Sequence, residues 1–289
     1  MQLSIFTAPD QPFPHRPKPE LGEFPVVTAS RRTDLVGWYR DYLIKVLREK
    51  YPPARTHTLV PVTKFAGALL KEPLRPVLES YESLFVHLTC TGMGGTEFEP
   101  LAPAVEETFR VLPELLAFLK DPRRLRFRVD PIIHVQKGRQ TYTNLPLAEE
   151  IIQRAVEAGA KDFSTSFMTI YPKTVRQFGA SGWEPVELMA GEKQEIFARL
   201  RRLTDSLGAR LFACCTEGLP ESRCIDAFLL TELHPRRIPC SGFEPRSRAY
   251  CACHHSVDIG GFYNQPCKTG CRYCYARPQL TYGGAGFPA

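Results

Sequence analysis

Residues 24–53 read FPVVTASRRTDLVGWYRDYLIKVLREKYPP and hold the first complete structural unit that the sequence predicts. The apolar run at the start of this stretch predicts a short buried strand. Apolar residues then recur at i, i+3, i+4 and i+7 between Leu35 and Leu47, which is typical of an amphipathic helix. Thr33 or Asp34 can cap the start of this helix, and a proline pair ends it. A strand followed at once by a helix is the unit from which parallel sheets with helical crossovers are built.

The same unit recurs along the chain. Apolar or alternating patterns predict five more strands, at residues 56–62, 84–89, 125–130, 162–168 and 210–215. Clear helical patterns follow at residues 103–120, 146–159 and 196–207. Six such units between about residues 25 and 220 predict an α/β fold with a parallel sheet. The pattern alone leaves two forms open, a six-unit open barrel and a flat doubly wound sheet.

Polar side chains follow most of the predicted strands at the point where each strand ends. In barrels the active site lies at the carboxyl ends of the strands, so we expect these side chains to converge on one mouth. They are Ser30, Arg31, Arg32, Thr63, Lys64, Thr89, Thr91, Asp130, Ser166 and Glu217.

Composition divides the chain into three regions. Residues 1–24 are a proline-rich lead-in, residues 25–220 hold the six units, and residues 221–289 form a tail rich in cysteine, proline, arginine and glycine. The lead-in has no basic segment followed by an apolar one, so it does not have the pattern of a secretory signal. No apolar run reaches the length of a membrane span. We therefore expect a cytoplasmic protein with no membrane partner.

The cysteine content points to metal chemistry. Ten cysteines in a chain with no export signal need an explanation other than disulfides, which a reducing cytosol does not sustain. Metal or cluster ligation is the better explanation. The net charge of +6 is compatible with an anionic substrate or a nucleic acid, but it is well short of the charge of a dedicated nucleic-acid binder.

Three of the cysteines lie in one short stretch, residues 266–275, which read PCKTGCRYCY. Cys267, Cys271 and Cys274 have the spacing C-x3-C-x2-C, with Tyr273 directly before the last. Three thiolates on one loop can hold three irons of a [4Fe–4S] cluster and leave the fourth iron open. This motif resembles the signature of the radical S-adenosylmethionine (SAM) enzymes. In that superfamily the open iron binds SAM, and the aromatic residue lies near the adenine.

A zinc knuckle is the alternative for this loop. A structural zinc site normally has four protein ligands, and zinc sites favour C-x2-C pairs. The candidates for the fourth ligand are Cys251, Cys253, His254 and His255.

Four cysteines form a second predicted set, made of Cys215, Cys224, Cys251 and Cys253. Four thiolates can hold a complete auxiliary [4Fe–4S] cluster, and the alternatives are a structural zinc ion or buried free thiols. We expect Cys90 and Cys214 to be small buried hydrophobic residues. Cys240 is a further candidate in place of Cys224.

Several segments together resemble one family, the domain of unknown function 1848 family of bacterial and archaeal proteins. The matching segments span about residues 26 to 277 and are Thr28–Asp34, Leu88–Gly92, Arg128–Ile133, Cys224–Asp226, the Cys251-x-Cys253 pair with Ser256–Gly260, and the terminal cysteine loop. One departure is visible after the second strand, where the family tends to have Trp-Thr-Lys-Asn-Pro and this chain has Val62-Thr63-Lys64-Phe65-Ala66. Substrate contacts in that loop are therefore expected to differ.

The resemblance implies a fold and a mechanism class. The expected fold is a partial (β/α)6 TIM-type barrel of the radical SAM kind, whose cysteine-rich C-terminal extension folds over the barrel mouth. The expected cofactors are one or two [4Fe–4S] clusters and SAM, reduced by a donor such as ferredoxin or flavodoxin. The implied reaction is reductive cleavage of SAM to a 5′-deoxyadenosyl radical, which then acts on a substrate that the resemblance does not identify.

Residues outside the cysteine loop complete the predicted cofactor site. Gly94 and Gly95 lie in a segment similar to the one whose backbone carbonyls bind the SAM amino group, although a surface turn explains them equally well. The arginines near the strand ends suit the SAM carboxylate or an anionic substrate, and Asp130 suits the ribose; ion pairs at the strand ends are the alternative. The predicted contacts are Arg31, Arg32, Thr89, Thr91, Gly94, Gly95, Arg128, Asp130 and Tyr273.

Two alternatives involve nucleic acid. One is a non-enzymatic zinc or iron–sulfur protein that binds nucleic acid, and the other is a repair enzyme similar to spore photoproduct lyase. Two basic clusters, at residues 120–128 and 199–202, motivate them. The second cluster lies opposite an apolar stripe, and the aromatic residues expected of a single-strand binder are absent, so a solvated helix face is the preferred explanation.

Overall fold

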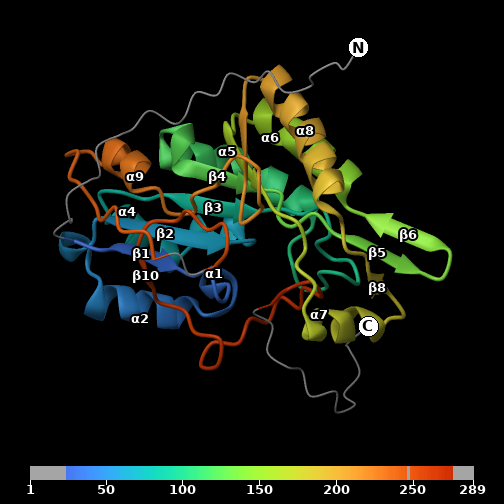
Figure 1. Ribbon diagram of the computed structural model, residues 1–289. Helices are drawn as coiled ribbons and strands as arrows, with labels where there is room; N and C mark the ends of the chain where they lie inside the picture. Colours follow the sequence, from blue (N-terminus) through green and yellow to red (C-terminus); the bar gives the residue numbers. More distant parts are fainter. Residues whose placement is uncertain (1–23, 246–247, 276–289) are drawn as a thin grey trace.

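The structure, a computed structural model, describes residues 24–245 and 248–275. Nearly all of the predicted lead-in and the last part of the tail lie outside this range. The centre of the described chain is a seven-stranded parallel sheet with helices packed against it (Figure 1). Its strands are β1 (Val26–Ala29), β2 (Thr58–Thr63), β3 (Val86–Thr89), β4 (Leu125–Arg128), β7 (Asp162–Thr165), β9 (Arg210–Ala213) and β10 (Val257–Asp258).

The strand order distinguishes the two forms that the sequence left open. The order is β10-β1-β2-β3-β4-β7-β9, and every pair is parallel. The six predicted strands therefore follow one another across the sheet without a reversal. A doubly wound sheet reverses its order at a switch point, so this sheet is not doubly wound. All six carboxyl ends lie along one edge of the sheet.

The seventh strand was not predicted. β10 comes from the cysteine-rich tail and pairs with the first strand, with Val27 opposite Val257 and Thr28 opposite Asp258. A strand of two residues is too short to show a periodic pattern in the sequence. Its pairing with β1 depends on the path of the whole tail, which the sequence does not reveal.

The helices agree with the predicted units, with additions. They are α1 (Leu35–Trp38), α2 (Arg40–Lys50), α3 (Ala66–Leu69), α4 (Leu74–Glu79), α5 (Val105–Leu119), α6 (Leu145–Glu157), α7 (Pro172–Gly179), α8 (Ala190–Ser206) and α9 (Ala227–Leu233), besides the 3₁₀ helices Pro53–Arg55 and Pro122–Arg124. The single helix predicted after β1 is divided at Tyr39 into α1 and α2. Asp34 is the N-cap of α1, because the Asp34 carboxylate accepts a 2.9 Å hydrogen bond from the Gly37 amide.

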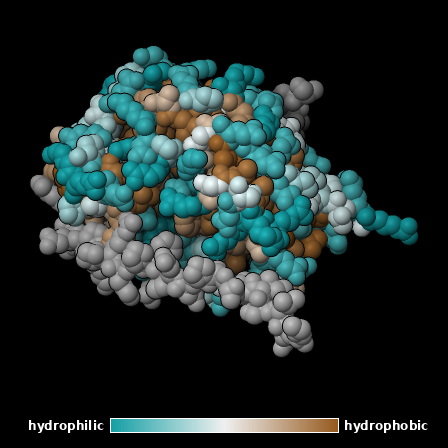
Figure 2. Space-filling view, turned by 90° about the horizontal axis from the view of Figure 1, so that it is seen from above, coloured by the Kyte–Doolittle hydropathy of each residue, from teal (hydrophilic) through white to brown (hydrophobic). Residues whose placement is uncertain are grey.

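A small antiparallel sheet lies beside the main one and was also not predicted. It has the order β6-β5-β8, from Gln140–Thr143, His134–Lys137 and Glu184–Pro185. The β5–β6 hairpin projects from the body, and its tip is hydrophilic (Figures 1 and 2). The base of this sheet packs into its own apolar cluster, which includes Met93, Phe98, Phe178 and Trp183.

The tail also covers one face of the main sheet. Val27 and Leu59 face the large core shared with the outer helices. Val26 and Val60, which point to the opposite face, pack with α9 in a second apolar cluster. The tail was expected to lack an apolar face of its own, and α9 is a correction to that expectation. Within the described residues, no helix combines the length and the apolar character needed to cross a membrane.

Candidate cofactor and metal site

A cavity of about 260 Å³ lies at the carboxyl ends of the strands. Its walls come from the loops after β1, β2, β3, β4, β7 and β9 and from the cysteine-rich tail. Among the residues that line it are Thr89, Asp130 and all three cysteines of the terminal loop. The expectation that this loop lies over the strand ends, beside Thr89 and Asp130, is therefore confirmed.

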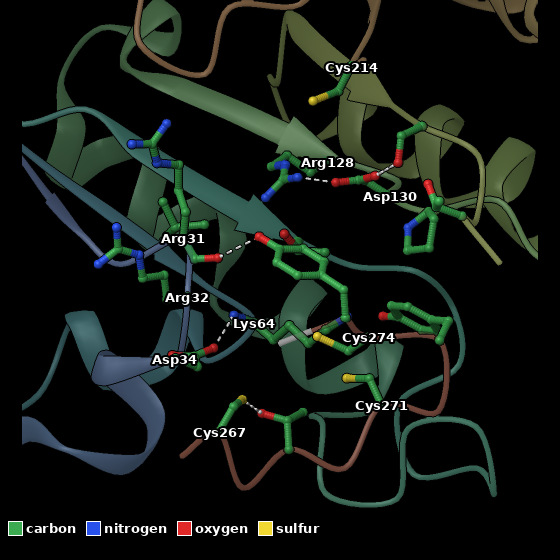
Figure 3. A pocket seen from close by; sticks show the side chains of 18 of the residues that line it. Arg31, Arg32, Asp34, Lys64, Arg128, Asp130, Cys214, Cys267, Cys271 and Cys274 are labelled. Atoms are coloured by element: carbon green, nitrogen blue, oxygen red, sulfur yellow. Dashed lines mark hydrogen bonds and ion pairs between the residues drawn. The ribbon is translucent and has the colours of Figure 1, made fainter. Parts of the chain in front are cut away.

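The three loop cysteines face one another across this cavity (Figure 3). The sulfur atoms of Cys267, Cys271 and Cys274 point toward one shared space. Cys271 is buried, and Cys267 and Cys274 are partly exposed. Burial raises the pKa of the Cys271 thiol well above its usual value, and the nearby Glu99 carboxylate raises it further.

The first helices fix one side of the cysteine loop. The indole Nε1 of Trp38 donates a 2.9 Å hydrogen bond to Thr269 Oγ1, and the phenol of Tyr39 donates a 2.7 Å bond to the Pro266 carbonyl. Both aromatic residues lie where α1 gives way to α2, so the break between those helices turns two side chains toward the loop. The break that the sequence did not predict therefore has a positioning role.

The segment after β3 fixes the other side of the loop. Arg272 Nε donates to the Glu97 carbonyl at 2.6 Å, and its Nη1 donates to the Gln177 carbonyl at 2.7 Å. The Leu101 amide donates to the Thr269 carbonyl at 3.2 Å. The loop is therefore held by the first helices, the segment after β3 and α7, all of which precede it by more than 80 residues.

A buried carboxylate joins the loop to the strand ends. Glu99 is 1% exposed and accepts hydrogen bonds from Thr91 at 2.6 Å, from Lys64 at 3.0 Å and from the Tyr273 phenol. Burial opposes the charged form of Lys64, but the Glu99 carboxylate and Cys271 outweigh it and raise the Lys64 pKa to about 12. Tyr273 lines the cavity, and its hydroxyl is directed to Glu99.

The predicted arginine and aspartate contacts are brought to the cavity, where they also form ion pairs. Arg128 pairs with Asp130, whose other oxygen accepts from Ser166. Arg31 Nε lies 3.6 Å from Asp258, and Arg32 donates to the Gly260 carbonyl at 3.4 Å. Arg128 and Arg31 therefore form the strand-end ion pairs that were the alternative. The cavity is nevertheless lined by Arg31, Arg32, Arg128, Asp130 and Ser166.

Three predicted contacts are not brought to the cavity wall, namely Thr91, Gly94 and Gly95. Thr91 lies outside the cavity lining, where its hydroxyl donates a hydrogen bond to Glu99. A Cβ on Gly94 would lie 1.8 Å from the Pro103 carbonyl oxygen, so close backbone packing explains that glycine. Gly95 begins a hydrogen-bonded turn, since its amide donates to the Glu99 carbonyl at 3.0 Å. The structure therefore supports the turn that was the alternative for this segment.

The second cysteine set comes together and gains a fifth member. Cys214, Cys215, Cys224, Cys251 and Cys253 form one buried cluster, which we call the five-cysteine group. The sulfur atoms of Cys214 and Cys215 are 3.8 Å apart, and the Cys224 amide donates to Cys253 Sγ at 3.2 Å. Hydrogen bonds from the thiols of Cys214 and Cys253 hold the pKa of Cys224 well below its usual value. Cys214 is buried, as expected, but it also lies against Cys215 and so joins the predicted set.

The remaining thiols and histidines lie elsewhere. Cys240 is fully buried in the α9 cluster, so it does not replace Cys224, and Cys90 lies in the main core as expected. The four candidates for completing a zinc knuckle with the loop do not line the cavity. His254 Nδ1 instead accepts a 3.0 Å hydrogen bond from the Ala227 amide. A zinc knuckle built from the loop therefore finds no fourth ligand among them.

The two basic clusters are engaged in internal contacts. Several of their arginines have partners within the described chain: Arg123 with Asp121 and Glu232, Arg124 with the Leu84 carbonyl, Arg128 with Asp130, Arg199 with Glu149, and Arg201 with Asp205. Arg126 is buried with its guanidinium 4.6 Å from the centre of the Phe212 ring. These contacts weaken the case for a nucleic-acid surface that rested on the two clusters.

Sequence reasoning missed several residues of the site. Glu99 and Arg248 lie in irregular segments, and nothing in their spacing marks them. Tyr275, which also lines the cavity, directly follows the last loop cysteine, but the motif places no requirement on that position. Cys214 did carry a signal, because it stands next to a predicted ligand.

Comparison with known proteins agrees with the resemblance seen in the sequence. No curated protein matches the chain. Among solved structures, that of a "putative phosphonomutase" from Burkholderia cenocepacia J2315 is 13% identical over 75% of this chain and 77% of that chain, with a TM-score of 0.29, which is too low to carry an argument. A family model described as "Domain of unknown function (DUF1848)" matches residues 26–276. Because that match spans nearly the whole chain, the protein belongs to the domain of unknown function 1848 family.

Proposed function

We propose that this protein is a radical SAM enzyme built on a partial (β/α)6 barrel. The observation that carries the proposal is the position of the three loop thiols. They lie on one anchored loop, point into one space and line a cavity at the carboxyl ends of six strands arranged in chain order. In barrels this edge is where substrates and cofactors bind.

The donor set of the loop fits an iron–sulfur cluster better than a single metal ion. Within residues 24–245 and 248–275, no three His, Cys, Asp or Glu side chains are grouped as the ligands of one ion. Each thiolate of a [4Fe–4S] cluster binds a different iron, so its ligands stand farther apart than ligands that share one ion. Three thiols around an open space, which none of the four candidates for the fourth zinc ligand lines, fit a cluster with one open iron.

The residues around the loop fit a small zwitterionic cofactor. The Arg128–Asp130 pair presents a cation and an anion on one wall, and Arg32 adds a second cation. Arginine suits a carboxylate, and an aspartate can accept hydrogen bonds from ribose hydroxyls. A reduced [4Fe–4S] cluster, when bound, supplies the electron that cleaves SAM to methionine and a 5′-deoxyadenosyl radical.

The chain's own residues hold and shield this site. Trp38, Tyr39 and Arg272 fix the loop, so the three thiols keep one arrangement. Glu99 neutralises the charge of Lys64 directly behind the loop. The loop and the tail form part of the cavity wall, which limits the access of water to the site.

Anaerobic reconstitution tests the proposal. The protein is loaded with iron and sulfide and reduced with dithionite or with reduced flavodoxin or ferredoxin, and the formation of 5′-deoxyadenosine from SAM is then measured. We expect SAM cleavage in the native protein and its loss in Cys271→Ala. Cys240→Ala, which removes a fully buried thiol outside both cysteine groups, is the matched control and should retain cleavage. No cleavage by the reduced, iron-loaded native protein would sink the proposal.

A further inference from the structure

The wall of the cavity carries more cations than carboxylates. Among the described residues that line it, the cations are Arg31, Arg32, Lys64, Arg128 and Arg248, and the carboxylates are Asp34 and Asp130. An excess of positive charge on the wall of a cavity attracts anions and raises their local concentration. How many of these charges are available to a ligand depends on their partners within the protein.

Most of the cations have a carboxylate partner. The pairs are Lys64–Glu99, Arg128–Asp130 and Arg31–Asp258. The other two cations have different partners in the part of the chain that the structure describes. Arg32 donates to the Gly260 carbonyl at 3.4 Å. The Arg248 guanidinium lies 5.8 Å from the centre of the Tyr275 ring. Neither contact neutralises a positive charge, so Arg32 and Arg248 keep theirs.

Tyr275 lies where three of the arginines come together. Its hydroxyl donates a 3.4 Å hydrogen bond to the Arg31 carbonyl, and the residue is 40% exposed at the cavity. The guanidinium groups of Arg248, Arg128 and Arg31 all lie within electrostatic reach of the Tyr275 phenol. We call these four residues the arginine subsite.

Arg128 contributes a donor that the protein itself does not use. One of its terminal nitrogens holds Asp130, while its Nε is buried and has no hydrogen-bond partner among the described residues. A buried donor without a partner costs free energy, which a bound acceptor would recover. In Figure 3, Arg31 and Arg128 lie toward one end of the cavity and the three loop sulfurs toward the other. These two guanidinium groups therefore lie away from the loop sulfurs.

The chemistry of the arginine subsite suits a carboxylate or a phosphate. A guanidinium group can hold two oxygens of either anion at once, and a phenol can donate to another. Phe167, Met168 and Tyr171 line the same cavity and offer an apolar surface to a carbon skeleton. A small organic anion fits this combination better than a nucleic acid, whose backbone is bound by cations spread along its length.

We propose that the arginine subsite binds the anionic group of the substrate, which is a small organic carboxylate or phosphate ester. Arg248 is the principal cation, because its partner in the described chain is an aromatic ring and not a carboxylate. Arg32 and Asp130 remain for SAM. The identification of the bound anion as the substrate rests on the proposed function, whereas the anion site itself does not.

Titration of the reconstituted full-length protein with inorganic phosphate and with succinate tests the subsite. At constant ionic strength, isothermal titration calorimetry should show saturable binding of at least one of these two anions. Tighter binding of phosphate would identify a phosphate ester as the ligand, and tighter binding of succinate would identify a carboxylate. If neither anion binds saturably, or if a short single-stranded oligonucleotide binds more tightly than both, the proposal is wrong.

Substitutions in the subsite test which residues hold the anion. Arg248→Met should weaken binding at least about tenfold, because a hydrogen bond to a charged group is lost. Arg248→Lys keeps the charge without the bidentate geometry, so its affinity should lie between those of the native protein and Arg248→Met. Arg110→Met is the matched control, since Arg110 is an exposed arginine of α5 outside the cavity lining, and it should bind like the native protein. Equal affinities of Arg248→Met and Arg110→Met would refute the assignment.

A competing explanation is that Arg248 only offsets the charge of the five-cysteine group. Arg248 lies within electrostatic reach of Cys215, Cys214 and Cys224. Arg31 is anchored differently, by Asp258 and by the Ser256 hydroxyl. Arg31→Met should therefore also weaken anion binding while its iron, sulfide and zinc contents stay native. If Arg31→Met binds the anion normally and Arg248→Met loses metal together with the anion, Arg248 serves the cysteines and the proposal fails.

Competition with SAM separates the subsite from the cofactor site. In protein that cleaves SAM, saturating SAM should leave anion binding in place, and displacement of the anion by SAM would overturn the proposal. A protein that binds the anion but does not cleave SAM would contradict the proposed function and leave the anion site standing. SAM cleavage without anion binding would do the opposite.

Discussion

The indole of Trp38 donates a 2.9 Å hydrogen bond to the hydroxyl of Thr269, and this contact joins the first helix to the cysteine loop across 231 positions of the sequence. The same Thr269 hydroxyl lies 3.4 Å from Cys267 Sγ. One threonine therefore connects the body of the protein to a proposed cluster ligand. The first prediction concerns this pair.

Trp38→Phe and Thr269→Val should each lower the free energy of unfolding, and together they should cost less than the sum of the two. A net hydrogen bond is worth about 1 kcal/mol, so the coupling free energy from a double-mutant cycle should be about that size. Urea denaturation of the four proteins measures it. A coupling close to zero would mean that the bond contributes nothing to the anchoring of the loop.

The buried pair of Lys64 and Glu99 makes the second prediction. Their side chains are 13% and 1% exposed, so Lys64→Met leaves a buried carboxylate with only the Thr91 and Tyr273 hydroxyls as donors. Removing one partner of a buried pair costs about 3 to 5 kcal/mol. Lys64→Met should be destabilised by that amount, and Lys64→Met/Glu99→Leu should recover much of it.

An exposed ion pair is the control for this second prediction. Arg75 lies 2.9 Å from Glu79 on one helix face, and both side chains are at least 40% exposed. Arg75→Met should change the free energy of unfolding by less than about 1 kcal/mol. Equal losses for Lys64→Met and Arg75→Met would contradict the special role of the buried pair.

The third prediction concerns the contact that seats β10 against β1. A Cβ on Gly260 would lie 2.2 Å from Ser30 Oγ and 2.5 Å from Ser30 Cβ. Gly260→Ala should therefore destabilise the protein by about 1 to 3 kcal/mol, as overpacking does, and Ser30→Gly in the same chain should restore part of that loss. Thermal and urea denaturation measure both effects.

Gly191 supplies the matched control for Gly260. It lies in the first turn of α8, and nothing stands within 4 Å of its Cβ position. Gly191→Ala should be neutral or stabilising by up to about 1 kcal/mol, because alanine favours the helix. If the two alanine variants were equally stable, close packing at Gly260 would not be the reason for its glycine.

The fourth prediction is a loss of stability in mild acid. Burial, together with His57, whose ring centroid is 4.6 Å away, lowers the pKa of His234 from 6.5 to about 4. Between these two values the unfolded chain binds more protons than the folded chain. Stability should therefore fall as the pH drops from 6.5 toward 4, by up to about 1.4 kcal/mol per pH unit from this group.

His234→Gln tests the source of that slope. The free energy of unfolding of the variant should depend less steeply on pH over the same range, while above pH 7 the neutral histidine contributes no such slope. Urea denaturation at several pH values compares the two proteins. Identical slopes would show that other groups account for the acid sensitivity.

The six strand-then-helix units could be predicted because each carries a repeating pattern. The strand from Val86 to Thr89 is buried at every position, and the helix from Leu145 to Glu157 buries one face; an apolar run and a helical period report these two kinds of burial. The strand order could not be predicted, since both barrel and doubly wound sheets are built from the same units. Elements with few residues were missed for a similar reason, and β10 and β8 have two residues each.

The residues of the candidate site could likewise be predicted only in part. The loop cysteines could be found because their spacing is local, and three thiols within eight residues must share a neighbourhood. Cys214 was predicted to be buried but not to join the second set, because alternation along a strand places it opposite Cys215, whereas the backbone at Cys215 is left-handed. The role of Gly94 stayed open because a glycine required by packing against Pro103 has the same sequence signal as one that approaches a ligand.

The pairing of β10 with β1 sets the order in which the main sheet can form, because β10 is made long after β1. Residues 257–275 emerge from the ribosome after the six-stranded sheet, so β1 first waits as an open edge of that sheet. Cys214, Cys215 and Cys224 are also made before Cys251 and Cys253, and the tail must close a loop of more than 200 residues to reach β1. The five cysteines can therefore come together only after the tail has been made, later than the strands that carry the rest of the cavity.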